Sequence, residues 1–354
     1  MQYRLPHYAS VNRIVLYERG KKREIVPITI WDRMLQKVLC GNALIPVLES
    51  KLIYDNGASM KGKGVDFARK RLMHHLHKAT LEFGSDFYAL VFDFKSFFDS
   101  IPHQTCFNIL NENFKDKHIV NLTMDIIKSY EKSQIWQIKD ADIRREKLNN
   151  LNANKSKGIC LGSQVSQILA LVVPNKLDHF IKDHEKVKHY MRYMDDGIIF
   201  AKSKSFLKKL FSKMKEICKE LGLIFNEKKT AIVKAAKGFT FMKVKYRVTE
   251  TGKIIRKLTR AGIVRMKRKL KKFKRKVDSG DMTLDDVFSS MQSWLEHSKI
   301  AMSYNTRKSM LKLYDDLFDG YKITNKWKRM KGGKDGEILQ TDKCREFRWD
   351  CIAA

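Results

Sequence analysis

The order of apolar and polar residues along the chain predicts two acidic positions at the ends of buried strands. A continuous apolar run of strand length begins at Tyr88 and ends in Asp93. A second acidic position, Asp195 followed by Asp196, lies between two predominantly apolar stretches. Because Asp-Gly after a β-prone segment is a hairpin signal, and Gly197 follows Asp196, we expect these two acids to project from a hairpin tip.

Helical spacing of apolar residues marks several other segments. It is present in residues 34–39 and again in residues 164–183, where Pro174 should kink or break the helix. Residues 284–317 show the same spacing and predict a helical segment whose apolar side belongs to a core. The Asn- and Lys-rich residues 148–155 instead predict an exposed loop.

The composition describes a globular chain with a large excess of positive charge. Of its 354 residues 43% are hydrophobic, which is enough to bury a sizeable core. Seventy-one Lys and Arg against 39 Asp and Glu give a net charge of +32, which favours a polyanionic partner such as nucleic acid. The sequence contains no apolar stretch of about 18 residues and no signal-peptide pattern, so we expect a cytoplasmic protein with no membrane partner.

The positive charge is densest in residues 253–276, which contain 13 Lys or Arg and no acid. Apolar residues at helical spacings within this segment predict a basic amphipathic helix. Such a helix can lie on a membrane, remain solvated or bind the phosphates of a duplex. The six cysteines are scattered without a CxxC pair, which argues against a zinc ribbon and against a disulfide framework.

Two adjacent acids between buried strands need a physical reason. Two anions about 4 Å apart in a poorly hydrated site repel by several kcal/mol, so a fold that keeps them usually supplies a divalent cation. A merely solvated turn is the alternative. If the fold also brings Asp93 to Asp195 and Asp196, three carboxylates can hold two Mg²⁺ ions, with Mn²⁺ as a substitute. Two such ions support in-line phosphoryl transfer.

These acidic segments resemble motifs of one known family. Phe92-Asp93-Phe-Lys-Ser-Phe-Phe98 resembles the first palm motif of reverse transcriptases, and Tyr193-Met194-Asp195-Asp196 resembles their YxDD box. Other motifs of the family are similar to segments that lie in the expected order. They are residues 22–36 and 55–64 (fingers), 158–167 (template and nucleotide contact), 221–230 (the motif after the YxDD box) and 238–243 (primer grip). The resemblance covers roughly residues 12–320.

The resemblance implies an α+β fold, namely the right-hand polymerase fold with fingers, palm and thumb. Residues 1–85 would form the fingers and residues 86–246 the palm, an antiparallel sheet plus helices that carries the carboxylates. Residues 247–320 would form a basic helical thumb, and residues 321–354 a basic C-terminal tail.

The resemblance also implies an activity and a set of substrates. The chain would be an RNA-directed DNA polymerase that copies an RNA template from a DNA or RNA primer with dNTPs. Asp93 and Asp195 would ligate both Mg²⁺ ions, and Asp196 would support the site electrostatically or ligate one ion weakly. Lys229, or its neighbour Lys228, would protonate the leaving pyrophosphate.

Further residues would contact the incoming nucleotide. Phe98 would act as a steric gate against a ribose 2′-hydroxyl, and a core aromatic residue is the alternative reading. Gln164 and Gln167 would touch the nucleotide or the template. The triphosphate would be bound by cations of the fingers, and Gly62 and Gly64 would let backbone amides approach its oxygens. These cations are Lys22, Arg23, Lys61 and Lys63.

One motif indicates a branch of the family. Leu161-Gly162-x-x-x-Ser166-Gln167 is similar to the variant found in enzymes of diversity-generating retroelements among the bacterial reverse transcriptases. Reverse transcriptases of anti-phage defence systems are neighbouring groups that can share it. A dedicated noncoding RNA and a small accessory protein are the expected partners. Two alternative functions stay open: template-independent or protein-primed DNA synthesis, and a catalytically silent RNA-binding scaffold.

Overall fold

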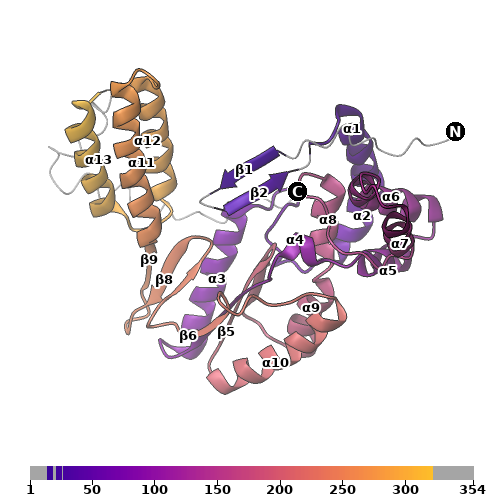
Figure 1. Cartoon of the computed structure of the whole chain (residues 1–354). Coiled ribbons are helices and arrows are strands. Elements are labelled where there is room, and N and C mark those ends of the chain that lie inside the picture. The colour runs from indigo at the N-terminus through magenta and orange to yellow at the C-terminus, as the bar shows by residue number, and fades with distance from the viewer. Residues whose placement is uncertain (1–13, 19–20, 26, 322–354) are drawn as a thin grey trace. The chain divides into compact units, whose positions relative to one another are not determined.

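The computed structural model describes residues 14–18, 21–25 and 27–321 (Figure 1). The chain divides into two compact units, residues 1–242 with 246–254 and residues 243–245 with 255–354. Residues 322–354 of the predicted C-terminal tail lie outside the described residues. The boundaries predicted between fingers, palm and thumb stay predictions.

The first unit begins with a hairpin and a group of helices. Strands β1 (Ile14–Glu18) and β2 (Lys21–Ile25) pair antiparallel. Several helical elements follow before the main sheet: α1 (Ile30–Leu39), η1 (Cys40–Leu44), α2 (Ile45–Leu48), η2 (Glu49–Lys51) and α3 (Val65–Phe83). Helix α1 begins at Thr29, whose hydroxyl accepts a hydrogen bond from the backbone N–H of Asp32.

A four-stranded antiparallel sheet lies at the centre of this unit. Its strands are β3 (Tyr88–Asp93), β4 (Tyr190–Tyr193), β5 (Asp196–Ala201) and β6 (Ala231–Lys234), in the order β4-β5-β3-β6. The central strands β3 and β5 are buried along most of their length. This burial explains why both are continuous apolar runs in the sequence instead of alternating patterns. The predicted α+β class is confirmed.

Helices pack against this sheet and enclose the main hydrophobic core. The helices that follow β3 along the chain are α4 (Phe97–Ser100), α5 (His103–Asn113), α6 (Lys117–Ile135), α7 (Ala141–Asn152), α8 (Gln164–Val172), α9 (Asn175–His179), η3 (Phe180–His184) and α10 (Lys204–Glu220). Leu90 and Phe92 of β3 join one core with apolar residues of α5, α6, α8 and α10. Helix α3 contacts β4 and β5.

Two predictions on local structure have different outcomes in this unit. The helix predicted over residues 164–183 does break at Pro174, which separates α8 from α9. The exposed loop predicted at residues 148–155 is partly wrong, because only residues 153–155 form a loop and α7 continues to Asn152. Its inner face is formed by Arg144, Leu148 and the buried Leu151, whose spacing is helical although the intervening residues are polar.

A three-stranded sheet follows, in the order β7-β8-β9, and the division between the two units runs through it. Its strands are β7 (Phe239–Phe241), β8 (Val244–Val248) and β9 (Ile254–Leu258). In β8, Val244, Tyr246 and Val248 are buried and the residues between them are exposed. This alternation is that of a strand with one buried face.

The second unit is a three-helix bundle of α11 (Arg260–Asp278), α12 (Leu284–Ser298) and α13 (Tyr304–Phe318) with its own hydrophobic core. The helix predicted over residues 253–276 is partly wrong, since residues 254–258 form β9 and the helix begins only at Arg260. The segment predicted over residues 284–317 is two helices instead of one. Its apolar residues belong to the core as predicted: Val287, Met291 and Leu295 are buried, and Phe288 and Trp294 pack against them.

In the part of the chain that the structure describes, no helix is both long and apolar enough to cross a membrane.

Candidate active site

The sheet brings the two acidic segments together. Asp93, the last residue of β3, lies directly opposite Asp196, the first residue of β5. Tyr193 also pairs with Asp196, so Met194 and Asp195 form the two-residue turn between β4 and β5. The predicted hairpin is present, but its tip is Met194-Asp195, two residues earlier than the signal of Asp196 and Gly197 indicated. Met194 carries a φ of 54°, a left-handed conformation that non-glycine residues adopt only when their surroundings enforce it.

Gly197 lies within β5 and not in the turn, and its missing side chain makes room for a neighbouring ring. It lies opposite Phe92 in the β3–β5 pair. A Cβ atom at Gly197 would lie 2.1 Å from Cζ of the Phe92 ring. The ring of Phe92 therefore lies over the backbone of Gly197, next to the two acids.

The segment before β6 contacts Asp93 directly. The backbone N–H of Asn226 donates to the carbonyl oxygen of Asp93 at 2.7 Å, and Asn226 Nδ2 donates to Asp93 Oδ1 at 3.2 Å. Lys229 Nζ donates to the other carboxylate oxygen, Oδ2. Asp93 is only 4% exposed. Lys228 is exposed, and no interaction of its side chain with the acids is seen.

The electrostatics of the three acids indicate a site that requires positive charge. Burial and then the neighbouring carboxylates of Asp195 and Asp93 raise the pKa of Asp196 to about 7. Burial acts to lower the pKa of Lys229, but its hydrogen bond to Asp93 and the nearby carboxylates outweigh burial, so the net shift is upward. The ammonium of Lys229 partly neutralises this cluster.

The acids supply carboxylate oxygens suited to a divalent cation but do not complete a metal shell. Among the described residues, no group of three or more His, Cys, Asp or Glu side chains is arranged to hold a metal ion by itself. Carboxylate oxygens are nevertheless the ligands that Mg²⁺ prefers, and this ion usually takes only a few protein ligands beside waters and substrate phosphates.

A buried ion pair contacts the turn between β4 and β5. Arg192 of β4 and Asp178 of α9 are both completely buried, with Arg192 Nη2 2.6 Å from Asp178 Oδ2 and Arg192 Nε 2.8 Å from Oδ1. The hydroxyl of Tyr190 donates to the same carboxylate at 2.6 Å. Arg192 Nη1 donates to the backbone carbonyl of Met194 at 2.9 Å. Arg192 therefore fixes the turn that carries Asp195.

The sequence interpretation missed this pair. Its signal was an arginine inside an apolar strand-forming run, because a buried arginine requires an acid elsewhere in the core. Asp178, between the apolar residues Leu177 and Ile181, is the matching acid.

The segment that resembles the template and nucleotide motif forms the start of α8. Ser163 caps this helix, and its hydroxyl donates to Gln36 Oε1 at 2.9 Å. The backbone N–H of Gln164 donates to the same Oε1 at 3.0 Å, so Gln36 of α1 connects the two segments. The side chain of Gln164 is half-buried and that of Gln167 is exposed.

Phe98 lies on α4, five residues after Asp93, and its side chain is half-buried. Its ring packs edge-on against Phe97 with centroids 5.8 Å apart. Its carbonyl oxygen accepts a hydrogen bond from the backbone N–H of Ile159 at 2.9 Å. This bond joins α4 to the loop before α8.

Of the four cations predicted to bind the triphosphate, the structure describes the side chains of Lys61 and Lys63. Lys61 is exposed in the turn before α3. Lys63 Nζ donates to the carbonyl of Tyr54 at 2.8 Å and lies 5.0 Å from the centroid of the Tyr54 ring, so it is already engaged within the fingers segment. The turn before α3 also contacts the β4–β5 hairpin, since the hydroxyl of Ser59 lies 3.9 Å from the sulfur of Met194. Lys22 and Arg23 lie on β2, and their side chains are outside the described part of the structure.

Comparison with known proteins identifies the family. The family model described as "Reverse transcriptase (RNA-dependent DNA polymerase)" matches residues 18–246. The chain belongs to the reverse transcriptase family. The matched range contains both strands that carry the acids and the segment of Asn226 and Lys229. No curated protein matches the chain.

Solved telomerase structures are similar to this reverse transcriptase at low identity. They include telomerase from Candida tropicalis in complex with the TWJ fragment of telomeric RNA (13% identity, 95% of this chain and 57% of that chain, TM-score 0.49). Telomerase from Candida albicans in complex with the TWJ fragment gives 13% identity over 85% of this chain and 54% of that chain, with a TM-score of 0.47. Apo telomerase from Candida tropicalis truncated from its C-terminal domain gives 14% identity over 72% and 56%, with a TM-score of 0.47. The chain thus spans little more than half the length of these proteins.

Proposed function

We propose that this reverse transcriptase is an RNA-directed DNA polymerase that extends a primer 3′-hydroxyl with dNTPs on an RNA template. The observation that carries the proposal is the register of β3 and β5, which sets Asp93 opposite Asp196 and beside the turn of Asp195. Two adjacent carboxylates and a third that is distant in the sequence thus meet at the same end of the two central strands. Membership of the family makes nucleotidyl transfer the reaction that such a cluster supports best.

Asp93, Asp195 and Asp196 would hold two Mg²⁺ ions, or Mn²⁺ in their place. Bound there, the ions would supply the positive charge that activates the primer hydroxyl and stabilises the leaving oxygen. Burial, and then repulsion from the carboxylates of Asp195 and Asp93, raises the pKa of Asp196, so a bound cation would favour its charged form. Arg192 would keep the turn in place as charge develops, because its guanidinium holds the carbonyl of Met194.

Other residues would bind and select the nucleotide. Lys229 would protonate the departing pyrophosphate, and its hydrogen bond to Asp93, next to the other two acids, supports this role. The ring of Phe98 would exclude a ribose 2′-hydroxyl. Lys22, Arg23, Lys61 and Lys63 would contact the triphosphate, with Lys61 as the exposed cation among those whose side chains are described. Gln164 and Gln167 would contact the template or the nucleotide.

The second unit would bind the product duplex. In α11, the Lys and Arg side chains are exposed, except for the half-buried Lys274, while Met266 and Leu270 are buried in the bundle. Such a helix presents ammonium and guanidinium groups to phosphates and gives a salt-sensitive, sequence-independent affinity. We therefore propose that residues 247–320 act as the thumb.

The biological context is part of the proposal. The chain would act in the bacterial cytoplasm with a dedicated noncoding RNA and a small accessory protein, as part of a retroelement or an anti-phage defence system. The similarity of residues 161–167 to the diversity-generating variant favours a retroelement. Sequencing of the cDNA distinguishes the two roles, because errors concentrated at template adenines indicate diversification and a repetitive product indicates defence.

The proposal is tested with RNA recovered by crosslinking to the chain in its native host. The purified protein, the bound RNA, labelled dNTPs and Mg²⁺ should yield a cDNA complementary to that RNA. Synthesis that continues without any template would instead support template-independent or protein-primed synthesis. RNA binding without synthesis under Mg²⁺ or Mn²⁺ would support the scaffold function.

A further inference from the structure

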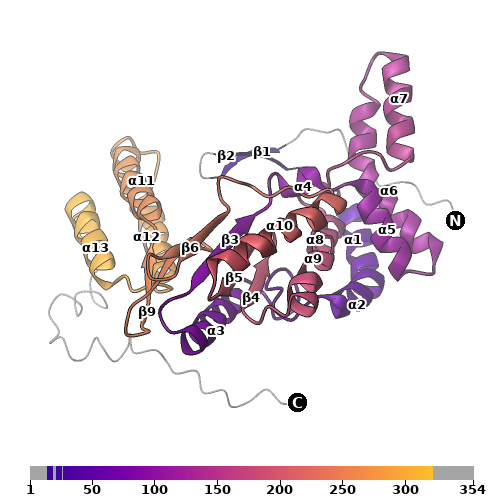
Figure 2. The same ribbon diagram turned by 90° about the horizontal axis from the view of Figure 1, so that it is seen from below.

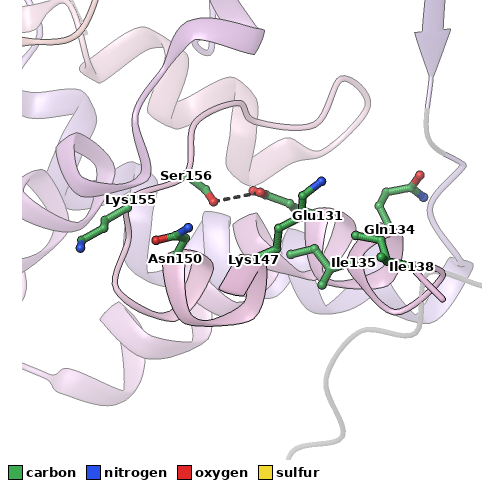
Figure 3. Close-up of a pocket in the computed structure, with 8 residues that line it drawn as sticks. All are labelled: Glu131, Gln134, Ile135, Ile138, Lys147, Asn150, Lys155 and Ser156. Carbon is green, nitrogen blue, oxygen red and sulfur yellow. Dashed lines mark hydrogen bonds between the residues drawn. The ribbon is translucent and has the colours of Figure 1, made fainter. Parts of the chain in front are cut away.

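A pair of adjoining pockets runs along α6 in the first unit. The first, of about 540 Å³, lies between α6 and α7 and extends to the segment of Lys155 and Ser156 (Figure 3). The second, of about 350 Å³, is lined by residues 157–161, which lead into α8. Glu131 and Gln134 line both pockets. We call the two pockets together the α6 trough; it extends from the α6–α7 hairpin to the loop that resembles the template and nucleotide motif.

The walls of the α6 trough combine positive charge with apolar surface. Lys147, Lys155 and Lys157 are exposed lining residues. The acids along the trough are Asp99 and Glu131, and Glu131 already accepts a hydrogen bond from the hydroxyl of Ser156 at 2.9 Å. Apolar surface comes from α6 and the segment that follows it. Ammonium groups beside apolar walls are suited to phosphates and to the flat faces of bases.

The residue that follows the α6 trough's lining residue Ile135 is an exposed tryptophan, which is not itself one of the lining residues. Trp136 is 60% exposed at the end of α6, directly after the lining residue Ile135. The guanidinium carbon of Arg144 lies 5.9 Å from the centroid of the Trp136 ring. Arg144 Nη1 also donates to the carbonyl of Ile138 at 2.8 Å, which ties α7 to the turn that carries the tryptophan. The α6–α7 hairpin projects from the rest of its unit in Figure 2. The ring of Trp136 is exposed and in contact with the guanidinium of Arg144.

We propose that the α6 trough binds the single-stranded RNA template before it is copied, with Trp136 stacking on an unpaired base. The proposal rests on the proposed function, since only a template-directed polymerase requires such a path. An exposed aromatic face stacks only on bases that are not paired, which excludes a duplex at this position. The lysines along the trough would contact the phosphates that follow towards residues 158–161.

The test measures dissociation constants of primer–template complexes, without dNTPs, for a short and a long single-stranded 5′ template overhang, of about 2 and about 12 nucleotides. In the wild type, the long overhang should bind more tightly than the short one. Trp136→Ala should remove about tenfold of that gain and Trp136→Phe should retain most of it, because stacking needs an aromatic ring. For Lys147→Gln with Lys155→Gln, the slope of log affinity against log salt should fall by about 0.7 for each lysine on the long overhang.

The matched control is Lys208→Gln with Lys209→Gln, which removes two exposed lysines from α10 of the same unit. It should leave the gain from the long overhang intact. A photoreactive thiouridine in the overhang should crosslink to peptides within residues 131–161. An equal loss of affinity for both overhangs in the Trp136→Ala variant, or crosslinks only outside these residues, would overturn the proposal. Binding is measured without synthesis, so a failure of the proposed polymerase activity shows separately as absent extension.

Discussion

The guanidinium of Arg192 and the carboxylate of Asp178 form a completely buried salt bridge, and Arg192 also donates to the carbonyl of Met194 in the turn between β4 and β5. Removing one partner leaves the other charged and buried, so Arg192→Ala or Asp178→Ala should lower the free energy of unfolding by about 3–5 kcal/mol. Lys176→Ala is a matched control, because it breaks an ion pair with Glu220 in which both side chains are 62% exposed. That change should cost less than about 1 kcal/mol. Urea unfolding measures both.

The conservative variant Arg192→Lys tests the positioning role of this residue. Lysine keeps the positive charge but cannot bind both Asp178 and the carbonyl of Met194 as a planar fork does. The variant should remain folded at 25 °C and should lower kcat for primer extension more than it changes the affinity for primer–template. An unchanged kcat in a folded variant would show that the contact with Met194 is only structural.

Lys229 and Lys228 are neighbours with different surroundings, which makes them a matched pair for the proton-donor role. Both side chains are exposed, but Lys229 donates a hydrogen bond to Asp93 and no contact of Lys228 with the three acids is seen in the described residues. Lys229→Ala should lower kcat by about a hundredfold, a typical contribution of a general acid, and Lys228→Ala should change it little. Single-turnover incorporation rates measure the effect. A larger loss in the Lys228 variant would assign the role to that residue.

Phe98 and Phe97 are a matched pair for testing whether Phe98 acts as a steric gate or is only a core aromatic residue. Phe97 is buried in the main core and Phe98 is half-buried. Phe98→Val should raise the use of ribonucleotides relative to deoxyribonucleotides by about tenfold or more, because the ring no longer meets the 2′-hydroxyl. Phe97→Leu should reduce stability without changing this ratio. The ratio of kcat/KM for the two nucleotide classes is the readout, and an unchanged ratio in Phe98→Val would support the core reading.

Asp55 gives the fold a dependence on acid pH. Burial alone would raise the pKa of Asp55, but hydrogen bonds from His75, Arg71 and Lys182 outweigh burial and hold its pKa well below the usual range. Its folded-state pKa is thus lower than the unfolded value of about 4, so this stabilisation is complete above about pH 4 and is lost as the pH falls further. Between pH 7 and pH 3, the wild type should lose about 1–2 kcal/mol more unfolding free energy than Asp55→Asn. Equal losses would contradict the assignment.

The parts of the site that are local in the sequence could be predicted from it. A buried strand that ends in Asp93 and a hairpin around Asp195 follow from apolar runs and a turn signal, and both are present. Which residues meet across the sheet depends on register, which no local pattern specifies. The contact between Asp178 and Arg192 was missed because it joins helix α9 to strand β4, and the packing of a helix on a strand is not specified by a local pattern either.

The predicted boundaries of helices and loops are wrong where polar and apolar signals conflict. The break between α12 and α13 is hidden because residues 300–302 are apolar, and the turn is stabilised instead by a hydrogen bond from the hydroxyl of Ser303 to the carbonyl of Ser298 at 2.7 Å. The last residues of α7, 148–152, were predicted as a loop because their exposed face is rich in asparagine, whereas a few inward residues suffice to pack the helix on α6. In both places tertiary packing outweighs local propensity.

The most direct test of the central claim is primer extension on an RNA template by the wild type and by Asp195→Asn, with affinity for primer–template measured in parallel. The wild type should incorporate dNTPs in the presence of Mg²⁺, and Asp195→Asn should abolish incorporation while leaving RNA affinity almost unchanged, because the variant removes a metal ligand and little else. Extension at the wild-type rate by Asp195→Asn would contradict the assignment of the three carboxylates to the catalytic site.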